Sequence, residues 1–254
     1  KLSLNVGKTK YMLFHHHQRN ISKLIPTLEI NNQQIELVSE FNFLGLTIDK
    51  HLNWKAHSQK VSNTVSRSLG VLCRLKKFLP MHILQLLYNS LILPHLQYCM
   101  LAWGLVRNRL EKLQKRAIRI ITCSRYNAHT EPLFKKMKLL KLSDIFDTNL
   151  LKLYFKYEHR LLPEFFLTNF FENMPNHRYP SRKNSSQRLP LVKTAHGQRR
   201  MPYVVANTLN NTTDCIIEKI ATHSYRGFSI YCKNYILSKY EENCLKASCY
   251  ICKH

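Results

Sequence analysis

The sequence predicts an α+β fold, in which a small antiparallel sheet is followed by a mainly α-helical bundle and a helical, partly irregular C-terminal extension. Apolar residues alternate in short runs up to Asp49, which is the period of strands, and from Trp54 they recur at the spacing of one helical face. Farther on, Pro, Ser and Asn become frequent before a helical pattern returns. We therefore divide the chain into residues 1–50, 51–165 and 166–254.

Three short apolar segments predict the sheet. Residues 11–14 form one run, and residues 28–30 and 35–38 alternate on either side of Asn31-Asn32, a pair that favours a hairpin turn. Residues 41–48 predict a further strand, in which Gly45 allows close approach of another backbone.

The helical bundle is predicted by amphipathic segments. Asn53 is a candidate N-cap for a helix from Trp54 to about Leu79, which Pro80 ends. A second helix follows from Pro80 and is interrupted near Pro94. Because it is apolar nearly all round, we expect it in the core.

Two later helices complete the bundle and are followed by the extension. They are expected at residues 108–122 and, with Ser143 as cap, at about 143–159. Residues 173–213 contain no acidic residue and read as a basic loop or arm, and from Ile216 a helical pattern resumes.

Positive charge is the most unusual feature of the composition. The chain of 254 residues has 39 Lys and Arg against 15 Asp and Glu, a net charge of +24. This excess favours a polyanionic partner, above all nucleic acid, although a basic composition can also be inherited without binding anything. No apolar run reaches the ~18 residues of a membrane helix, and the eight cysteines lack the density of a secreted disulfide scaffold. We therefore expect no membrane partner and a cytoplasmic or nuclear protein with reduced thiols.

Cationic stripes on two predicted helices are the candidate contacts for phosphates. Lys60, Arg67 and Arg74 repeat every seven residues and lie nearly opposite the apolar face. Lys112, Arg116 and Arg119 form a second stripe on a later helix. Between Asp49 and Glu111 there is no acidic residue, whereas a merely solvated face normally mixes both signs.

Several motifs in order resemble a known family. They are the segment Phe43-Leu-Gly-Leu-Thr-Ile-Asp49 continued by Leu52, Trp54 and His57, the earlier Leu4-Asn-x-x-Lys-Thr-Lys-Tyr-Met-Leu-Phe14, and the later Leu91-Ile-Leu-Pro-His-Leu-Gln-Tyr98, Ala102-Trp-Gly104, Leu113-Gln-Lys-Arg-Ala-Ile-Arg-Ile-Ile121 and His129-Thr-Glu-Pro-Leu133. Over about residues 2–165 the chain resembles the end of the palm and the start of the thumb in reverse transcriptases of non-LTR retrotransposons, the Jockey-like group especially. Several motifs in the right order are more specific than any one of them.

This resemblance implies a fragment of an RNA-directed DNA polymerase that binds an RNA template with a DNA primer. Phe43, Leu44 and Gly45 would match the hairpin that holds the primer end. Lys8 would match a lysine near the incoming triphosphate, a candidate general acid, and otherwise is a solvated charge. The chain starts at Lys1 without an initiator Met, so we expect it to be part of a longer polypeptide whose N-terminal palm and fingers precede it.

Catalysis by such an enzyme needs Mg²⁺ ions held by paired carboxylates. In the family these lie in a Tyr-x-Asp-Asp turn and an earlier strand, and the sequence contains no Tyr-x-Asp-Asp. Asp49 is a lone carboxylate, so we expect no catalytic metal site, no cofactor and no polymerase activity in this chain by itself. The alternatives are a non-catalytic basic nucleic-acid-binding helical protein, and a helical scaffold that binds an acidic protein.

Two groups of soft ligands are candidates for metal binding. Cys244, Cys249, Cys252 and His254 lie close together, but the spacing of the last two is too tight for an ordinary zinc finger. Unpaired thiols are the simpler interpretation. The run of residues 15–17, all His, is expected to bind metal adventitiously at most.

Overall fold

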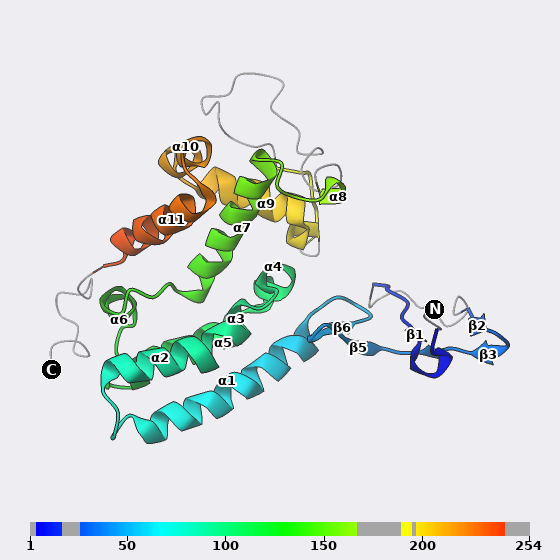
Figure 1. The fold of residues 1–254 in the computed structure, drawn as a ribbon, viewed down its shortest axis with the longest axis horizontal. Helices are drawn as coiled ribbons and strands as arrows, with labels where there is room; N and C mark the ends of the chain where they lie inside the picture. Colours follow the sequence, from blue (N-terminus) through cyan, green and yellow to red (C-terminus); the bar gives the residue numbers. More distant parts are fainter. Residues whose placement is uncertain (1–3, 17–25, 167–188, 195–196, 242–254) are drawn as a thin grey trace.

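A computed structural model describes residues 4–16, 26–166, 189–194 and 197–241 of the chain. Within these ranges the molecule is mainly helical, with small β ladders at one end of its long axis (Figure 1). The expected α+β composition is confirmed at this level. No helix among the described residues is both long enough and apolar enough to span a membrane.

The β region consists of three separate two-stranded ladders. Its elements are η1 (Val6–Lys8), β1 (Lys10–Tyr11), β2 (Glu29–Ile30), β3 (Gln33–Gln34), β4 (Glu36–Leu37), β5 (Glu40–Phe43) and β6 (Leu46–Asp49). The β2–β3 and β5–β6 pairs are antiparallel, but β1 pairs with β4 in parallel. The prediction of one antiparallel sheet was therefore wrong in its topology.

The two hairpin turns of this region were expected on different grounds. Asn31 and Asn32 both have positive φ, at 51° and 59°, and they form the expected tight turn between β2 and β3. The single strand expected at residues 41–48 is instead the β5–β6 hairpin, because Leu44 and Gly45 turn the chain with φ of 47° and 84°. Leucine seldom adopts positive φ, so local periodicity did not predict this turn, and only the family resemblance implied a hairpin at residues 43–45.

The helical part forms two groups. The first contains α1 (Lys55–Leu75), α2 (Met81–Leu91), α3 (Leu93–Gln97), α4 (Met100–Trp103), η2 (Gly104–Val106) and α5 (Asn108–Ile121). After α6 (Glu131–Lys136), the second contains α7 (Leu142–Glu158), α8 (Glu164–Phe166), η4 (Gly197–Arg199), α9 (Met201–Asn211), α10 (Asp214–Thr222) and α11 (Tyr225–Lys239). In Figure 1, α7 runs between the two groups, and it packs on α4 and α5 on one side and on α9 and α11 on the other.

One continuous hydrophobic core runs through both groups. Leu72, Leu84 and Trp103 are buried in the first, and Phe155 and Phe228 in the second. Burying such side chains supplies most of the free energy that offsets the chain entropy lost on folding.

A buried polar link fixes the junction between the two groups. The Gln114 amide nitrogen donates to the Tyr88 hydroxyl at 3.0 Å and to the Leu140 carbonyl at 3.1 Å, while its oxygen accepts from the Leu142 backbone at 2.8 Å. The amide nitrogen and the amide oxygen of Gln114 thus both have hydrogen-bond partners, as is usual for a buried amide.

Several helix details differ from the expectations. The first helix ends at Leu75, four residues before the expected position, and α2 is not core all round because Leu86 is 60% exposed and Met81 40%. The expected interruption near Pro94 is present, since α2 ends at Leu91 and α3 starts at Leu93. Half-buried Leu113 packs against the core without being fully enclosed in it.

The C-terminal extension contains more helix than expected. Residues 201–211, which were assigned to the basic loop, form α9, with Val204, Val205 and Leu209 buried against the core. Residues 173–188 of that expected loop lie outside the described part. Ser143 is not the cap of α7, because that helix begins one residue earlier and Lys141 occupies the N-cap position.

Candidate nucleic-acid interface

The carboxylate of Asp49 organises the connection between β6 and α1. Asp49, at the end of β6, is 6% exposed, and its carboxylate accepts hydrogen bonds of 3.0–3.2 Å from the backbone N–H groups of His51, Asn53 and Trp54. Asn53 accepts from Lys55 at 2.8 Å, so it does help to cap α1, although Trp54 holds the N-cap position. Both carboxylate oxygens of Asp49 accept hydrogen bonds from backbone N–H groups, so this carboxylate has a structural role in the connection.

A solvent-facing row of cations follows the whole of α1. Lys60, Arg67 and Arg74 are exposed, while Val65 and Leu72 on the opposite side are fully buried. At 1.5 Å per residue, the row spans about 21 Å. Within the described part of the chain, Lys10, Arg107 and Lys141 form ion pairs with carboxylates elsewhere, and no ion pair involves this row.

The neighbouring helix α5 brings a second cationic edge to the same side. Arg109 donates to the Gln59 side chain, and Gln59 in turn donates to Asn63 at 2.7 Å, so this edge of α5 lies against the exposed flank of α1. By helical periodicity, Lys112 and Arg116 follow Arg109 along this edge, and both are exposed. We refer to Lys60, Arg67, Arg74, Lys112 and Arg116 as the basic face.

Arg119 differs from the other expected contacts. Its Nε donates to the Ala128 carbonyl at 2.8 Å, and burial lowers the pKa of its guanidinium. The side chain therefore holds the loop that follows α5, and it is less available to a phosphate than Lys112 or Arg116.

The hairpin tip presents apolar side chains to solvent. Phe43 is 53% exposed and Leu44 73%. The Tyr98 hydroxyl donates to the Leu44 carbonyl at 2.5 Å, and a Cβ on Gly45 would lie 3.5 Å from the Tyr98 ring. Tyr98, whose role was not evident from the sequence, therefore supports the tip from the α3–α4 turn.

The remaining motif residues lie behind this tip. The Trp103 indole donates to the Tyr98 carbonyl at 2.8 Å and packs edge-on against His57, whose ring accepts from the Thr47 backbone at 3.3 Å. Burial lowers the pKa of His57, and the nearby Lys60 charge lowers it further, which favours the neutral acceptor form. Segments that are distant in sequence thus form one contact network around the base of the hairpin.

Replacing Tyr98 by Phe should loosen the hairpin without unfolding the protein. Because the bond to the Leu44 carbonyl is removed, the amides of residues 41–47 should exchange faster with solvent deuterium. Tyr126→Phe is the control, because Tyr126 is 89% exposed. Equal exchange of the hairpin amides in both variants would show that Tyr98 does not hold the tip.

Lys8 lies apart from the basic face. It is exposed at the end of η1, where its backbone N–H donates to the Asn5 side chain at 3.2 Å. In Figure 1, η1 lies beyond the β5–β6 hairpin as seen from α1. Lys8, the candidate general acid, therefore lies in a different part of the molecule from the basic face.

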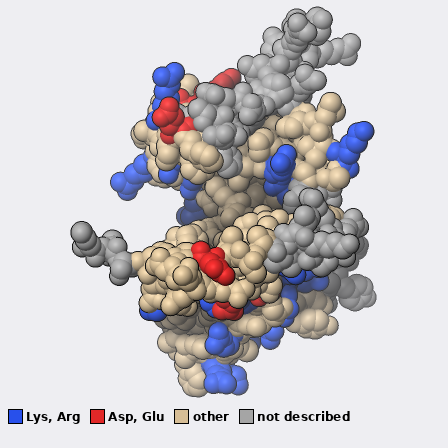
Figure 2. Space-filling model, turned by 90° about the vertical axis from the view of Figure 1, so that its right-hand side faces the viewer, with Lys and Arg blue, Asp and Glu red and all other residues tan. Residues whose placement is uncertain are grey.

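Charge and metal ligands can be surveyed over the described residues. Seen from the strand end, Lys and Arg side chains are spread widely and Asp and Glu are few (Figure 2). No group of three or more His, Cys, Asp or Glu within the described ranges could hold a metal ion. Cys244, Cys249, Cys252 and His254 lie outside those ranges.

The chain was compared with known proteins. No protein-family model, no curated protein and no solved structure matches it.

Proposed function

We propose that this chain is the C-terminal part of a reverse transcriptase from a Jockey-like non-LTR retrotransposon, comprising the end of the palm, the thumb and a C-terminal extension. Its role is to bind the duplex of RNA template and DNA primer. The sequence motifs support the family, and the basic face supports the role. The observation that carries the proposal is the exposed row on α1, in a stretch without any acidic residue from Lys50 to Leu110.

The physical basis is counterion release. A nucleic-acid duplex carries condensed cations, and each Lys or Arg that contacts a phosphate releases some of them. A row of about 21 Å on one helix can reach several phosphates at once. In this proposal the exposed tip at Phe43 and Leu44 contacts the primer end.

Catalytic metal ions fit poorly in the described part of the chain. Mg²⁺ in the intact enzyme would neutralise the triphosphate and activate the primer hydroxyl. Asp49 uses both carboxylate oxygens for backbone donors, and the sequence has no Tyr-x-Asp-Asp turn. We therefore assign this chain to binding and positioning.

Purified protein should bind an RNA–DNA primer–template without extending it. We expect affinity that falls steeply with salt, and no added nucleotides when deoxynucleotides and Mg²⁺ are supplied. Polyglutamate at the same charge concentration is the control competitor. Protein-dependent extension would contradict the assignment to binding, and competition by polyglutamate as strong as by unlabelled duplex would favour an acidic protein partner.

A further inference from the structure

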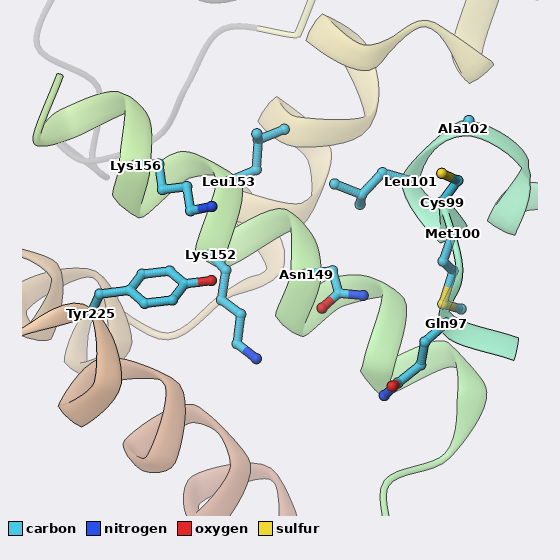
Figure 3. Close-up of a pocket in the computed structure, with 10 residues that line it drawn as sticks. All are labelled: Gln97, Cys99, Met100, Leu101, Ala102, Asn149, Lys152, Leu153, Lys156 and Tyr225. Carbon is cyan, nitrogen blue, oxygen red and sulfur yellow. The ribbon is translucent and has the colours of Figure 1, made fainter. Parts of the chain in front are cut away.

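A groove in the helical part belongs to none of the features described above. It has a volume of about 450 Å³ and lies between the α3–α4 turn, α7 and the start of α11 (Figure 3). This volume is within the range of pockets that bind small organic ligands. The lining comes from three segments that are far apart in the sequence.

One end of the groove is cationic. Lys152 and Lys156 lie one turn apart on the same face of α7, and the Lys156 ammonium is 5.2 Å from the centre of the Tyr225 ring. None of the described lining residues is Asp or Glu. Burial lowers the pKa of Lys152; the Cys232 thiol opposes this shift, and the charge of Lys233 adds to it. An anion placed here would be attracted by both ammonium groups, because no lining carboxylate competes for them.

The other end is apolar but carries two amides. Leu101 and Leu153 approach from opposite sides in Figure 3, and the side chain of Asn149 lies between the two ends. Gln97 also lines the groove, and in Figure 3 it lies below Asn149. No hydrogen bond joins either amide to another described residue. A bound acyl chain would cover these amides without pairing them, which is unfavourable, whereas a planar heterocycle offers donors and acceptors at its edge.

We propose that this groove binds one nucleotide unit. The phosphate lies at Lys152, Lys156 and the Tyr225 hydroxyl, and the base lies between Leu101 and Leu153 with its edge against Asn149. The inference is independent of the basic face, because its residues lie on α7, α11 and the α3–α4 turn. The shared chemistry, a phosphate joined to a base, is present both in a free mononucleotide and in a single strand.

Titration calorimetry on the full chain tests the site. We expect AMP to bind, adenosine and inorganic phosphate to bind more weakly than AMP, and oleate not to displace it. A single-stranded RNA pentamer that binds more tightly than AMP identifies a strand as the natural source, and AMP at least as tight as the pentamer identifies a free nucleotide. The proposal would be overturned if neither AMP nor the pentamer binds. It would also be overturned if oleate binds more tightly than AMP and displaces it.

A double variant locates the phosphate. Lys152→Gln with Lys156→Gln should weaken AMP binding about 10-fold or more, because charge-assisted hydrogen bonds are lost. The matched control replaces Lys136 and Lys138, two exposed residues at the end of α6, and should bind AMP as the parent does. The affinity of the double variant for a blunt RNA–DNA duplex should depend on salt as the parent's affinity does. This result would distinguish the groove from the basic face. Equal AMP affinity in the double variant and the parent would overturn the proposal.

Photo-crosslinking of the parent protein provides a test that needs no variant. A photoreactive 8-azido-AMP should label peptides within residues 97–103 or 149–156. Labelling confined to other peptides would overturn the assignment of the site.

Discussion

A variant with Lys60, Arg67 and Arg74 all replaced by Gln should bind a blunt RNA–DNA duplex with a much weaker salt dependence than the parent protein. Each phosphate contact contributes about 0.9 to the slope of log affinity against log salt, so the slope should flatten by up to about 2.7. When the salt concentration rises fourfold, the parent should therefore lose roughly 40-fold more affinity than the variant does. The effect should be the same on every duplex sequence, because phosphates carry no sequence information.

A charge-matched control is needed for that experiment. Lys136, Lys138 and Lys233 are exposed and lie on α6, just beyond α6, and on α11. Their replacement by Gln changes the net charge equally, but it should leave most of the slope intact. Both triple variants should melt as the parent does, because all six side chains are exposed. Equal slopes for the α1 variant and the parent would mean that the row on α1 is only solvated.

Replacing Asp49 by Ala should be the most destabilising single change in the connection between the hairpin and α1. The variant loses the acceptors for the backbone N–H groups of His51, Asn53 and Trp54, and we expect the free energy of unfolding to fall by roughly 2–4 kcal/mol. Leu52 and Trp54 have φ of 50° and 59°, a backbone conformation that is costly for large side chains. The carboxylate stabilises this conformation.

An exposed carboxylate in the same region is the control. Glu36 pairs with Lys10 at 2.8 Å, but its side chain is 66% exposed, so Glu36→Ala should cost less than about 1 kcal/mol. Denaturant titration of both variants gives the comparison. If Asp49→Ala unfolds at the same denaturant concentration as Glu36→Ala, the carboxylate of Asp49 is not what organises the start of α1.

The sequence predicted best those features that depend on local periodicity. The buried and cationic sides of α1 followed from the apolar spacing at Val61, Val65 and Leu72, and the structure buries these residues and exposes Lys60, Arg67 and Arg74. The Asn31-Asn32 turn was predicted because asparagine tolerates positive φ. In both cases a few adjacent residues determine the result.

Features that depend on distant contacts did not follow from local periodicity. The turn at Leu44 is supported by Tyr98, 54 residues later, and α9 forms in a Pro- and Asn-containing stretch because Val205 and Leu209 pack on α7. The outer face of α2 is apolar at Leu86, so composition alone suggested burial where the structure has none. The groove at Lys152 has no sequence signal, since its lining comes from three separate segments.

The placement of a duplex on α1 can be measured directly by site-specific photo-crosslinking. A photoreactive amino acid is introduced at position 67, in the middle of the row, and in a second protein at position 233 on α11. Both positions are exposed. The account predicts that a labelled RNA–DNA duplex crosslinks at position 67 and only weakly at 233, and that raising the salt concentration removes the crosslink. No crosslink at position 67 under conditions where the duplex is bound, or equal yields at both positions, would contradict it.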